Sequence, residues 1–434
     1  MKKFILIISI LLTVFTSCTK YGYENEVRSK YEAGLISDWI GLHLRLIRNT
    51  TGVPHPAFSR HFAYTGVALY ETVAAADNKN KSIASLLNGD FQLPIAPSQQ
   101  LLFAPAAANA SLASMMRAWY SGNTANIQRI DSLEVVYQDR FTGEEKNSQK
   151  LEISRNWGRQ VAASVIRWSE TDGATLASIP YSLLGEGYWE PTPPAFANAL
   201  LAGWGNNRSI VPGSIMETIP AAPIAFSKIP GTPFHNMVKD VYDISQSLTN
   251  EQKFIANFWD DAPNGKYVSA FGHWFSVLKQ VLEKEKSSLF KAANAYLLLG
   301  ISMNDATISC WKTKYKYSQL RPVTYIRKYM GQPGWNSFIT TPNHPEYSAA
   351  HATLSGAAAF ALEFVFSKNY SFTDNTYEFL GMSARNYNSF EEAGTEAGMS
   401  RLYGGIHFRP SIEIGKLQGR KVAENVCNYL KEHK

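Results

Sequence analysis

Cysteine is scarce in this sequence, and its scarcity limits the folds and sites that the chain can form. The 434 residues hold three cysteines, which excludes a disulfide-rich scaffold and a zinc site built from cysteine or from mixed His and Cys ligands. Cys18 lies near the N-terminus, and Cys310 and Cys427 lie far along the chain. In an oxidising compartment the last two could pair, but Cys310 lies in an apolar helical run, where a buried free thiol is expected at least as often.

A strong excess of either charge is also missing. The chain has 42 Lys and Arg against 36 Asp and Glu, a formal net charge of +6, and it has no basic run interleaved with aromatic residues. Nucleic-acid-binding domains usually carry such a run or a much larger positive charge. The composition therefore excludes nucleic acid as an expected partner.

A single apolar run stands out near the N-terminus, and it is short. Lys2 and Lys3 precede the apolar residues from Phe4 to Phe15, and small residues then lead to Cys18. About 12 apolar residues fall short of the roughly 20 that span a bilayer, whereas a charged start with a short apolar core typifies a secretory signal. The cysteine makes the segment resemble a lipoprotein signal, cleaved before Cys18 with lipid attached to that thiol. We expect residues 1–17 to be removed and the lipid to anchor an exported protein in the bacterial cell envelope, in the periplasm or on the outer surface.

Sustained alternation of apolar and polar residues, which would indicate a substantial sheet, does not occur, and helical periodicity dominates instead. Residues 18–434 therefore predict one all-α domain, and an apolar content of 45% is enough for a large core. The domain divides into N-terminal helices over about 23–172, a loop over 173–233 and a C-terminal helical part over about 234–434. The individual helices are expected at 23–48, 57–76, 104–120, 127–140, 149–170, 237–248, 251–259, 274–285, 288–316, 347–366 and 410–431.

The segment 173–233 differs from the rest of the chain in its proline content. It holds nine of the 20 prolines, so it cannot be helical throughout. It also carries aromatic residues, which a free linker rarely has, among them Tyr181, Tyr188, Trp189, Phe196 and Trp204. We therefore predict an ordered loop laid over the helices. Long ordered loops often carry function, which makes this one a candidate wall of a site.

Three short motifs in the C-terminal part bring cations and imidazoles together. They are Lys314-x6-Arg321-Pro322, His344-Pro-Glu-Tyr-Ser-Ala-Ala-His351 and Ser400-Arg401-Leu-Tyr-Gly-Gly-Ile-His407. Lys314 and Arg321 are seven residues apart, within about 20° of the same helical face. Because Pro322 biases Arg321 away from helical geometry, we expect Lys314 in the last turn of a helix and Arg321 just past its end. His344 and His351 repeat the spacing, and Pro345 suits the first position of a helix.

Arg401 and His407 are six residues apart, which on a helix would point their side chains about 240° apart. The pair Gly404 and Gly405 must therefore break or tighten the backbone if both side chains are to face one object. Together the motifs supply three cations and up to three imidazoles. Three buried cations without an anion would be prohibitively unstable, so if they converge they bind an anion, and a tetrahedral oxyanion suits them.

The pattern Lys-x6-Arg-Pro, then Pro-Ser-Gly-His, then Ser-Arg-x5-His resembles the vanadium-dependent haloperoxidases and the related type 2 phosphatidic acid phosphatases. The matching residues here are Lys314, Arg321, Pro322, His351, Ser400, Arg401, Gly405 and His407. Further stretches, at 56–73, 187–204, 258–274 and 304–315, look like the bacterial haloperoxidases, so the resemblance covers most of the mature chain. It implies a two-bundle helical architecture and a vanadate cofactor, whose place phosphate could take.

The resemblance also implies a role for each matching residue. The catalytic residues would be His351, His407 and Arg401, with His351 as the acid–base group and His407 as the ligand of vanadium. The oxyanion would be held by Lys314, Arg321, Arg401, His407 and the backbone N–H of Ala350. The chain departs from the family pattern at two positions. Ala349 replaces a serine, with Ser348 one position early, and Ser411 replaces an aspartate that in the phosphatases often orients the second histidine, with Glu413 as a possible substitute.

As a haloperoxidase the protein would oxidise halide with hydrogen peroxide to hypohalous acid. The alternative is an acid phosphatase that hydrolyses a phosphate ester, with His407 as the nucleophile that forms a phosphohistidine and His351 protonating the leaving oxygen. Vanadate and phosphate are nearly isosteric, so the motifs do not separate the two activities, and the flanking stretches favour the haloperoxidase. A non-catalytic, glycan-binding surface lipoprotein is a third alternative, but it would have no need of these motifs.

Halide choice is expected to depend on a pocket formed by Trp311, His344 and Ser348. In the family, aromatic residues three before the lysine and seven before the acid–base histidine accompany chloride oxidation, whereas a histidine at the second position resembles the bromide-oxidising members. This chain combines Trp311 with His344, which predicts oxidation of bromide or iodide without useful oxidation of chloride. In the simpler alternative, His344 only caps a helix that Pro345 begins.

The lipid anchor gives the first testable prediction. Replacing Cys18→Ala removes the acceptor thiol, so the variant should be released in soluble form and should not incorporate a labelled lipid precursor. The wild-type protein should stay with the membrane and should incorporate the label. The measurement is fractionation of cells grown with the labelled precursor. A Cys18→Ala protein that stays with the membrane would contradict the prediction.

Overall fold

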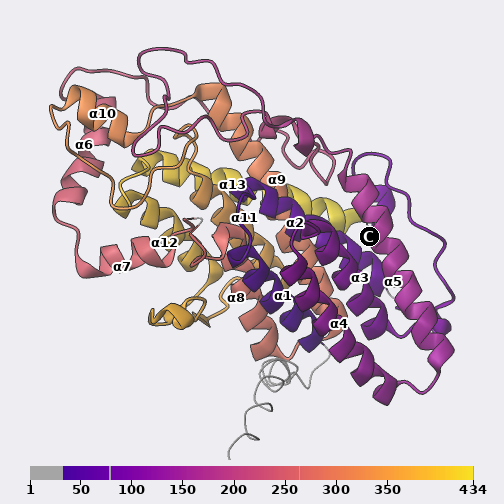
Figure 1. Ribbon diagram of the computed structural model, residues 1–434. Helices are drawn as coiled ribbons and strands as arrows, with labels where there is room; N and C mark the ends of the chain where they lie inside the picture. Colours follow the sequence, from indigo (N-terminus) through magenta and orange to yellow (C-terminus); the bar gives the residue numbers. More distant parts are fainter. Residues whose placement is uncertain (1–32, 78–79, 263, 434) are drawn as a thin grey trace, which may run out of the picture.

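The computed structural model describes residues 33–433 except 78, 79 and 263. Its regular structure consists of thirteen α-helices and one two-stranded sheet (Figure 1), which confirms the all-α prediction. The predicted signal segment, Cys18 and the first part of the helix expected at 23–48 lie outside the described residues. Among the described residues, no helix has both the length and the apolar character needed to cross a membrane.

The helices fall on either side of the long loop in the sequence. Before it come α1 (Gly34–Arg48), α2 (His55–Ala74), α3 (Ala104–Trp119), α4 (Thr124–Glu144) and α5 (Ser148–Ser169). After it come α6 (Pro233–Gln246), α7 (Asn250–Phe258), α8 (Ser269–Glu285), α9 (Leu289–Tyr317), α10 (Pro322–Tyr329), α11 (Ala350–Val365), α12 (Phe390–Tyr403) and α13 (Arg409–His433). The strands β1 (Phe372–Asp374) and β2 (Arg385–Tyr387) pair antiparallel between α11 and α12.

Two of these helices were not predicted from the sequence. The helix α10 has eight residues, too few for a periodic pattern to show. The helix α12 buries small residues such as Ala393 and Gly394 together with the charged Arg401, so its buried face is not an apolar stripe. Neither helix contradicts the fold class, but α12 carries one of the candidate site residues.

The helix α9 lies at the centre of the molecule, with α2, α11 and α13 packed around it (Figure 1). Most of its residues are buried, including Lys314 in its last turn. Glycines allow the close packing of α2 against α9, because a Cβ atom at Gly300 would lie 3.0 Å from the Cα atom of Ala63. The packing therefore places the C-terminal end of α9, which carries the first candidate motif, inside the protein rather than at its surface.

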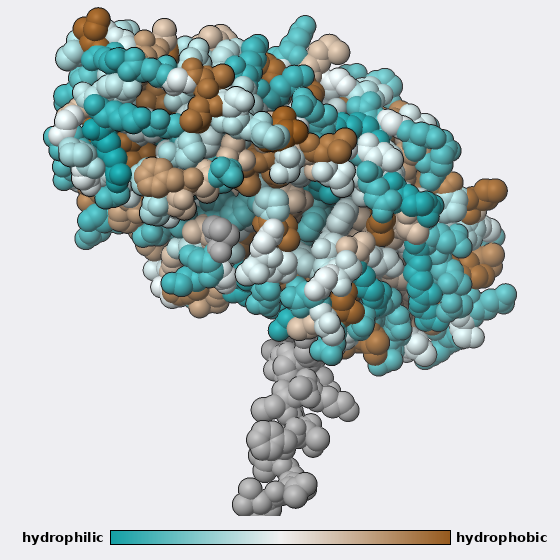
Figure 2. All heavy atoms as spheres, turned by 45° about the horizontal axis from the view of Figure 1, so that its top comes forward, coloured by the Kyte–Doolittle hydropathy of each residue, from teal (hydrophilic) through white to brown (hydrophobic). Residues whose placement is uncertain are grey.

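The loop over 173–233 is ordered, as predicted, and runs across the top of the molecule in Figure 1. A buried carboxylate on α9 holds its middle: Asp305 accepts hydrogen bonds from the backbone N–H groups of Ile210 and Val211, at 2.9 and 3.2 Å, and from Ser214. Burial raises the pKa of Asp305 to about 6. Figure 2 turns this region forward and shows apolar patches on that face. The loop contributes exposed apolar side chains to the surface, including Leu176, Leu183, Phe196, Met216 and Ile229.

The predicted helix start near Pro345 is wrong, because α11 begins at Ala350. The ammonium group of Lys314 donates hydrogen bonds to the carbonyl groups of Pro345, Glu346 and Ser348, at 2.9, 3.0 and 2.6 Å. Lys314 thus holds this segment in the non-helical conformation that it has before Ala350. The proposal that His344 only caps a helix begun by Pro345 is therefore also wrong.

Cys310 and Cys427 are both buried and do not form a disulfide with each other. Of the two possibilities left open by the sequence, the structure thus has two buried thiols.

The contact between α11 and α13 gives a prediction for stability. A Cβ atom at Gly419 would lie 1.7 Å from the carbonyl oxygen of Thr353, so Gly419→Ala should force the two helices apart and lower the free energy of unfolding by about 3 kcal/mol. The matched control is Gly143→Ala on α4, where nothing lies within 4 Å of the added Cβ. The control should leave stability unchanged or raise it by up to about 1 kcal/mol. Thermal unfolding of both variants checks this, and equal melting temperatures would contradict it.

Candidate active site

The three sequence motifs meet at one place, where several helices begin or end. Lys314 lies in the last turn of α9, Arg321 precedes α10, and His351 is the second residue of α11. Arg401 lies in the last turn of α12, and His407 lies in the turn before α13. Gly405 in that turn has a φ of +75°, a conformation that favours glycine, so the backbone reverses between Arg401 and His407 as their spacing required.

The imidazole of His407 is held by a carboxylate. His407 Nδ1 lies 2.7 Å from Glu346 Oε1, and the same oxygen accepts a hydrogen bond of 3.0 Å from the backbone N–H of Phe408. A carboxylate at Nδ1 holds a proton there and leaves the lone pair on Nε2. His407 Nε2 faces Arg321 Nη1 at 3.1 Å, which requires the same arrangement because a guanidinium group can only donate. Burial, with Arg321 and Lys314 nearby, keeps the pKa of His407 well below its usual range.

The contact between Glu346 and His407 corrects the sequence interpretation of which residue orients this imidazole. Glu413, considered there as a partner of His407, is exposed, and Ser411 is buried on α13. Glu346 lies inside the second motif but 61 positions from His407. Nothing in local spacing connects two residues so far apart, and the sequence interpretation passed over it.

Lys314 and Arg321, the two cations of the first motif, have different surroundings. Arg321 donates from Nε to the carbonyl of His344 at 2.9 Å and from Nη1 to that of Ile406 at 2.8 Å, and its Nη2 lies 3.1 Å from His344 Nδ1. It therefore touches two imidazoles, those of His344 and His407. Lys314 instead donates to the three carbonyl groups described above, and burial lowers its pKa. The ammonium group thus shapes the segment from Pro345 to Ser348 and lies behind the cavity.

A second group of side chains surrounds His351. Its Nε2 atom lies 3.5 Å from Arg401 Nη1 and 3.7 Å from Asp261 Oδ1. Asp261 Oδ2 lies 2.9 Å from Nδ1 of His55, the first residue of α2. Burial, and then the charge of Arg401, lowers the pKa of His351 to about 3. Asp261 and His55 were not proposed as site residues, although Asp261 falls in the stretch 258–274 that resembled bacterial haloperoxidases.

A cavity of about 400 Å³ lies beside these groups, and its lining includes the imidazoles but not Lys314, Arg321 or Arg401. The imidazoles of His344, His351 and His407 lie at its inner end beside Trp311 and Ala350, and Asp261 and His55 also line it. The rings of Trp311 and His344 have centroids 5.0 Å apart. Ser348 was expected in this pocket but is not among the lining residues, because its hydroxyl turns away and donates to Gln418 Oε1 at 2.5 Å.

The long loop forms one wall of this cavity, as its sequence suggested. Thr192, Pro193, Pro194, Ala195, Ala197 and Leu200 line it. The carbonyl of Leu200 accepts hydrogen bonds from the Tyr315 hydroxyl at 2.7 Å and from Trp311 Nε1 at 3.3 Å. The wall is therefore attached to α9 at the same turns that carry Trp311 and Lys314.

Comparison with known proteins identifies the family. Residues 294–434 match the family model described as the VCPO second helical-bundle domain. A solved structure described as the first bacterial vanadium-dependent iodoperoxidase is 30% identical, with 92% of this chain and 97% of that chain covered and a TM-score of 0.81. This chain belongs to the vanadium-dependent haloperoxidase family.

Two more distant haloperoxidase structures share the fold. The holo form of a bacterial vanadium-dependent chloroperoxidase is 15% identical over 87% of this chain and 92% of that one, with a TM-score of 0.63. The apo-type bacterial structure is 14% identical, covers 87% and 94%, and has a TM-score of 0.62. No curated protein sequence matches the chain. The protein is thus a haloperoxidase, an oxidoreductase that has a vanadate cofactor and uses hydrogen peroxide and halide. The comparisons do not favour the acid phosphatase alternative.

The residues of this haloperoxidase fit an oxyanion such as vanadate. Lys314, Arg321 and Arg401 are buried cations, and the carboxylates near them are the buried Glu346 and the half-buried Asp260 and Asp261. No side chain of the described residues caps α11, so its first N–H groups, including that of Ala350, remain available to an anion. The unprotonated Nε2 atom of His407 supplies a ligand. The charge of the site, the direction of α11 and the available hydrogen-bond donors are therefore all compatible with a bound oxyanion.

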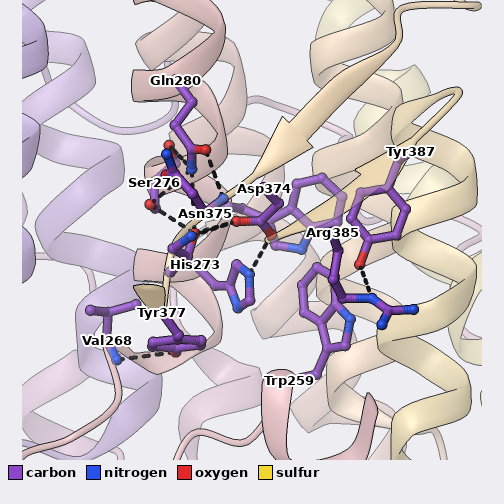
Figure 3. Close-up of polar contacts among 12 residues, drawn as sticks. Trp259, Val268, His273, Ser276, Gln280, Asp374, Asn375, Tyr377, Arg385 and Tyr387 are labelled. Carbon is purple, nitrogen blue, oxygen red and sulfur yellow. Dashed lines mark hydrogen bonds and ion pairs between the residues drawn. The ribbon is translucent and has the colours of Figure 1, made fainter. Parts of the chain in front are cut away.

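Behind the haloperoxidase site, a further group of side chains lies around Trp259 and His273 (Figure 3). Arg401 Nη2 donates to the carbonyl of Trp259 at 3.0 Å. The indole of Trp259 stacks on His273, with ring centroids 4.1 Å apart, and His273 Nε2 lies 2.7 Å from Asp374 Oδ2 on β1. Trp259 Nε1 also donates to Glu396 on α12. The small hairpin thus supports the backbone between α7 and Asp261.

The contact between Glu346 and His407 generates a prediction for cofactor affinity. Glu346→Gln keeps an acceptor for the Nδ1 proton of His407 but removes the charge, so vanadate affinity should fall by about tenfold or more. Calorimetric titration of the apo-protein with vanadate measures it. The matched control is Glu413→Gln, which changes an exposed carboxylate on α13 and should leave the affinity unchanged. Equal affinities of the two variants would show that Glu346 does not orient the ligand.

Proposed function

We propose that this haloperoxidase oxidises iodide or bromide, and not chloride, on a vanadate ligated by His407. The observation that carries the proposal is the position of His344, whose ring lies beside Trp311 at the inner end of the cavity and within 3.1 Å of Arg321. Arg321 touches both His344 and the proposed vanadium ligand His407. The residue that distinguishes halides is therefore one hydrogen bond from the cofactor site.

Bound vanadate would supply Lewis-acid activation of hydrogen peroxide. The protein positions it: Nε2 of His407 is the ligand, and Arg321, Arg401 and the N–H of Ala350 donate to its oxygens. Lys314 adds positive charge from behind the segment that it holds. This is the same set of residues that the sequence motifs suggested, with Lys314 acting at longer range.

His351 is the proposed acid–base group of the reaction. The low pKa of its imidazole keeps the ring neutral near neutral pH, so its unprotonated nitrogen can accept a proton from hydrogen peroxide. An anion in the cavity would offset the charge of Arg401 and raise this pKa toward the working range, which favours return of the proton. Asp261, at 3.7 Å, stabilises the protonated imidazole.

The halide preference follows from how Arg321 is shared. Arg321 directs Nε at the carbonyl of His344, and Nη2 at its ring. The N–H groups of Arg321 that contact His344 are not available to vanadate. Vanadate that accepts fewer charge-assisted hydrogen bonds would withdraw less electron density from peroxide. A weaker oxidant still oxidises iodide, the most easily oxidised of the three halides, and fails with chloride. The similarity to a structure described as an iodoperoxidase supports the same preference.

Steady-state assays with iodide, bromide and chloride test the proposal. The wild-type holoenzyme should oxidise iodide or bromide, with chloride oxidation slower by about 100-fold or more, which corresponds to roughly 2.7 kcal/mol in activation free energy. His344→Phe frees Arg321 Nη2 and should raise the ratio of chloride to iodide turnover, whereas His433→Phe, at an exposed position on α13, should not. Efficient chloride oxidation by the wild type would overturn the preference.

A further inference from the structure

The overall reaction consumes a proton, and the inner end of the cavity has little direct access to the solvent that supplies it. Halide, hydrogen peroxide and one proton give hypohalous acid and water: the oxygen–oxygen bond breaks, an oxygen–halogen bond forms, two electrons pass from halide to peroxide, and the added proton leaves in the water. Every turnover therefore consumes one proton. His351, His344 and His407 are exposed by 8%, 5% and 2%, so the inner imidazoles have little direct access to solvent.

Asp261 connects the inner end of the cavity with its outer end. One carboxylate oxygen, Oδ1, faces Nε2 of His351 at 3.7 Å, and the other, Oδ2, faces Nδ1 of His55 at 2.9 Å. The side chain of His55 is 25% exposed and that of His351 is 10% exposed. His55 and His351 both line the cavity, which leaves room for water between them. The same carboxylate thus stabilises a positive imidazole at either end.

The electrostatic surroundings of His55 suit a proton donor. The titratable or charged groups that face it are Asp261 and Asp260 from the segment after α7, and His351 from α11. Burial opposes the charged form, but Asp261 and then Asp260 outweigh burial, and the pKa of His55 is raised. His55 therefore binds a proton more readily than His351, whose pKa is lowered.

We propose that His55 is a proton-relay residue, which takes protons from solvent and passes them through cavity water to His351 along the carboxylate of Asp261. The relay rests on the acid–base role proposed above for His351. His55 gives a proton to cavity water and regains one from bulk solvent, so it is unchanged after each turnover. Of the cavity-lining imidazoles in the described part of the chain, it is the one with appreciable exposure, which is what a solvent-facing donor needs.

The test compares the wild-type holoenzyme with His55→Asn. Asparagine places an amide N–H near the position of Nδ1, so the contact with Asp261 is kept while the titratable group is lost. We expect kcat for iodide oxidation near neutral pH to fall by about tenfold or more, with vanadate affinity and melting temperature unchanged. Adding imidazole to the assay should restore the rate of the variant in a saturating manner and should not affect the wild type.

The pH dependence supplies a second readout. In the wild type the relay works while His55 is protonated, so kcat should stay level up to the raised pKa of His55 and fall above it. In His55→Asn, the proton must come from solvent directly, so kcat should fall continuously as pH rises over the range where the wild type is level. The control His433→Asn replaces an exposed histidine on α13 and should behave as the wild type.

The outcomes separate the relay from the proposed function. A wild type that is inactive toward both iodide and bromide overturns both proposals. An active wild type combined with a His55→Asn variant that keeps its rate and pH profile overturns the relay alone. Loss of activity that imidazole does not restore also overturns it, because that result indicates a structural role. If His55→Asn does not fold, His55→Gln is assayed in the same way, with the same outcomes deciding.

Discussion

The binding of backbone carbonyl groups by buried cations determines the shape of this active site. Lys314 takes the carbonyls of Pro345, Glu346 and Ser348, and Arg321 takes that of His344. The segment they hold cannot join α11, so that helix starts later and directs its free N–H groups into the cavity. The same segment carries His344 to Trp311 and Glu346 to His407. Loss of the ammonium group would remove a charge-assisted hydrogen bond from three buried carbonyl groups, and a buried acceptor left without a partner costs about 1–3 kcal/mol.

The charges of the site are arranged so that an anion completes them. Lys314, Arg321 and Arg401 are almost fully buried, and each donates hydrogen bonds to carbonyl groups, which do not neutralise its charge. Glu346, Asp260 and Asp261 lie near these cations and offset part of their charge. A bound oxyanion therefore stabilises the folded protein as well as enabling the reaction, since a ligand that binds only the native state raises its stability. Cofactor affinity and fold stability are linked through the same three side chains.

The cavity has two chemically different ends, and separate parts of the chain supply them. The inner end consists of the imidazoles of His344, His351 and His407, which Arg321 and Arg401 contact from outside the lining, and it is closed on one side by the loop segment attached through Leu200. An apolar wall excludes water and so strengthens the electrostatic interactions behind it. The outer end has His55 from the start of α2 and Asp261 from the segment after α7. The helix α2 therefore contributes a lining residue to a site whose motifs all lie in the C-terminal part.

The sequence by itself determined the fold class, the order of the long helices, the ordered proline-rich loop and the family. These properties depend on local patterns: apolar residues at helical spacing, prolines concentrated in one segment, and motifs whose members are a few residues apart. It also determined that Gly404 and Gly405 must break or tighten the backbone if Arg401 and His407 are to face one object, because side chains six residues apart on a helix point about 240° apart. The helix α12 escaped this reasoning, since its buried face consists of alanine, glycine and an arginine.

Tertiary structure alone decided which groups act together. Glu346 and His407 are 61 positions apart, and Asp261 and His55 are 206 apart, and each pair meets because separate helices pack around α9. The residue types alone did not predict these pairs, since most Glu, Asp and His residues in a sequence have no carboxylate–imidazole partner far along the chain. Tertiary contacts also overruled local preference at Pro345, which suits the first turn of a helix but lies in a segment whose carbonyls are bound by Lys314. A local pattern reports which structures a segment can form, and only the packing of distant segments decides which partners its polar groups find.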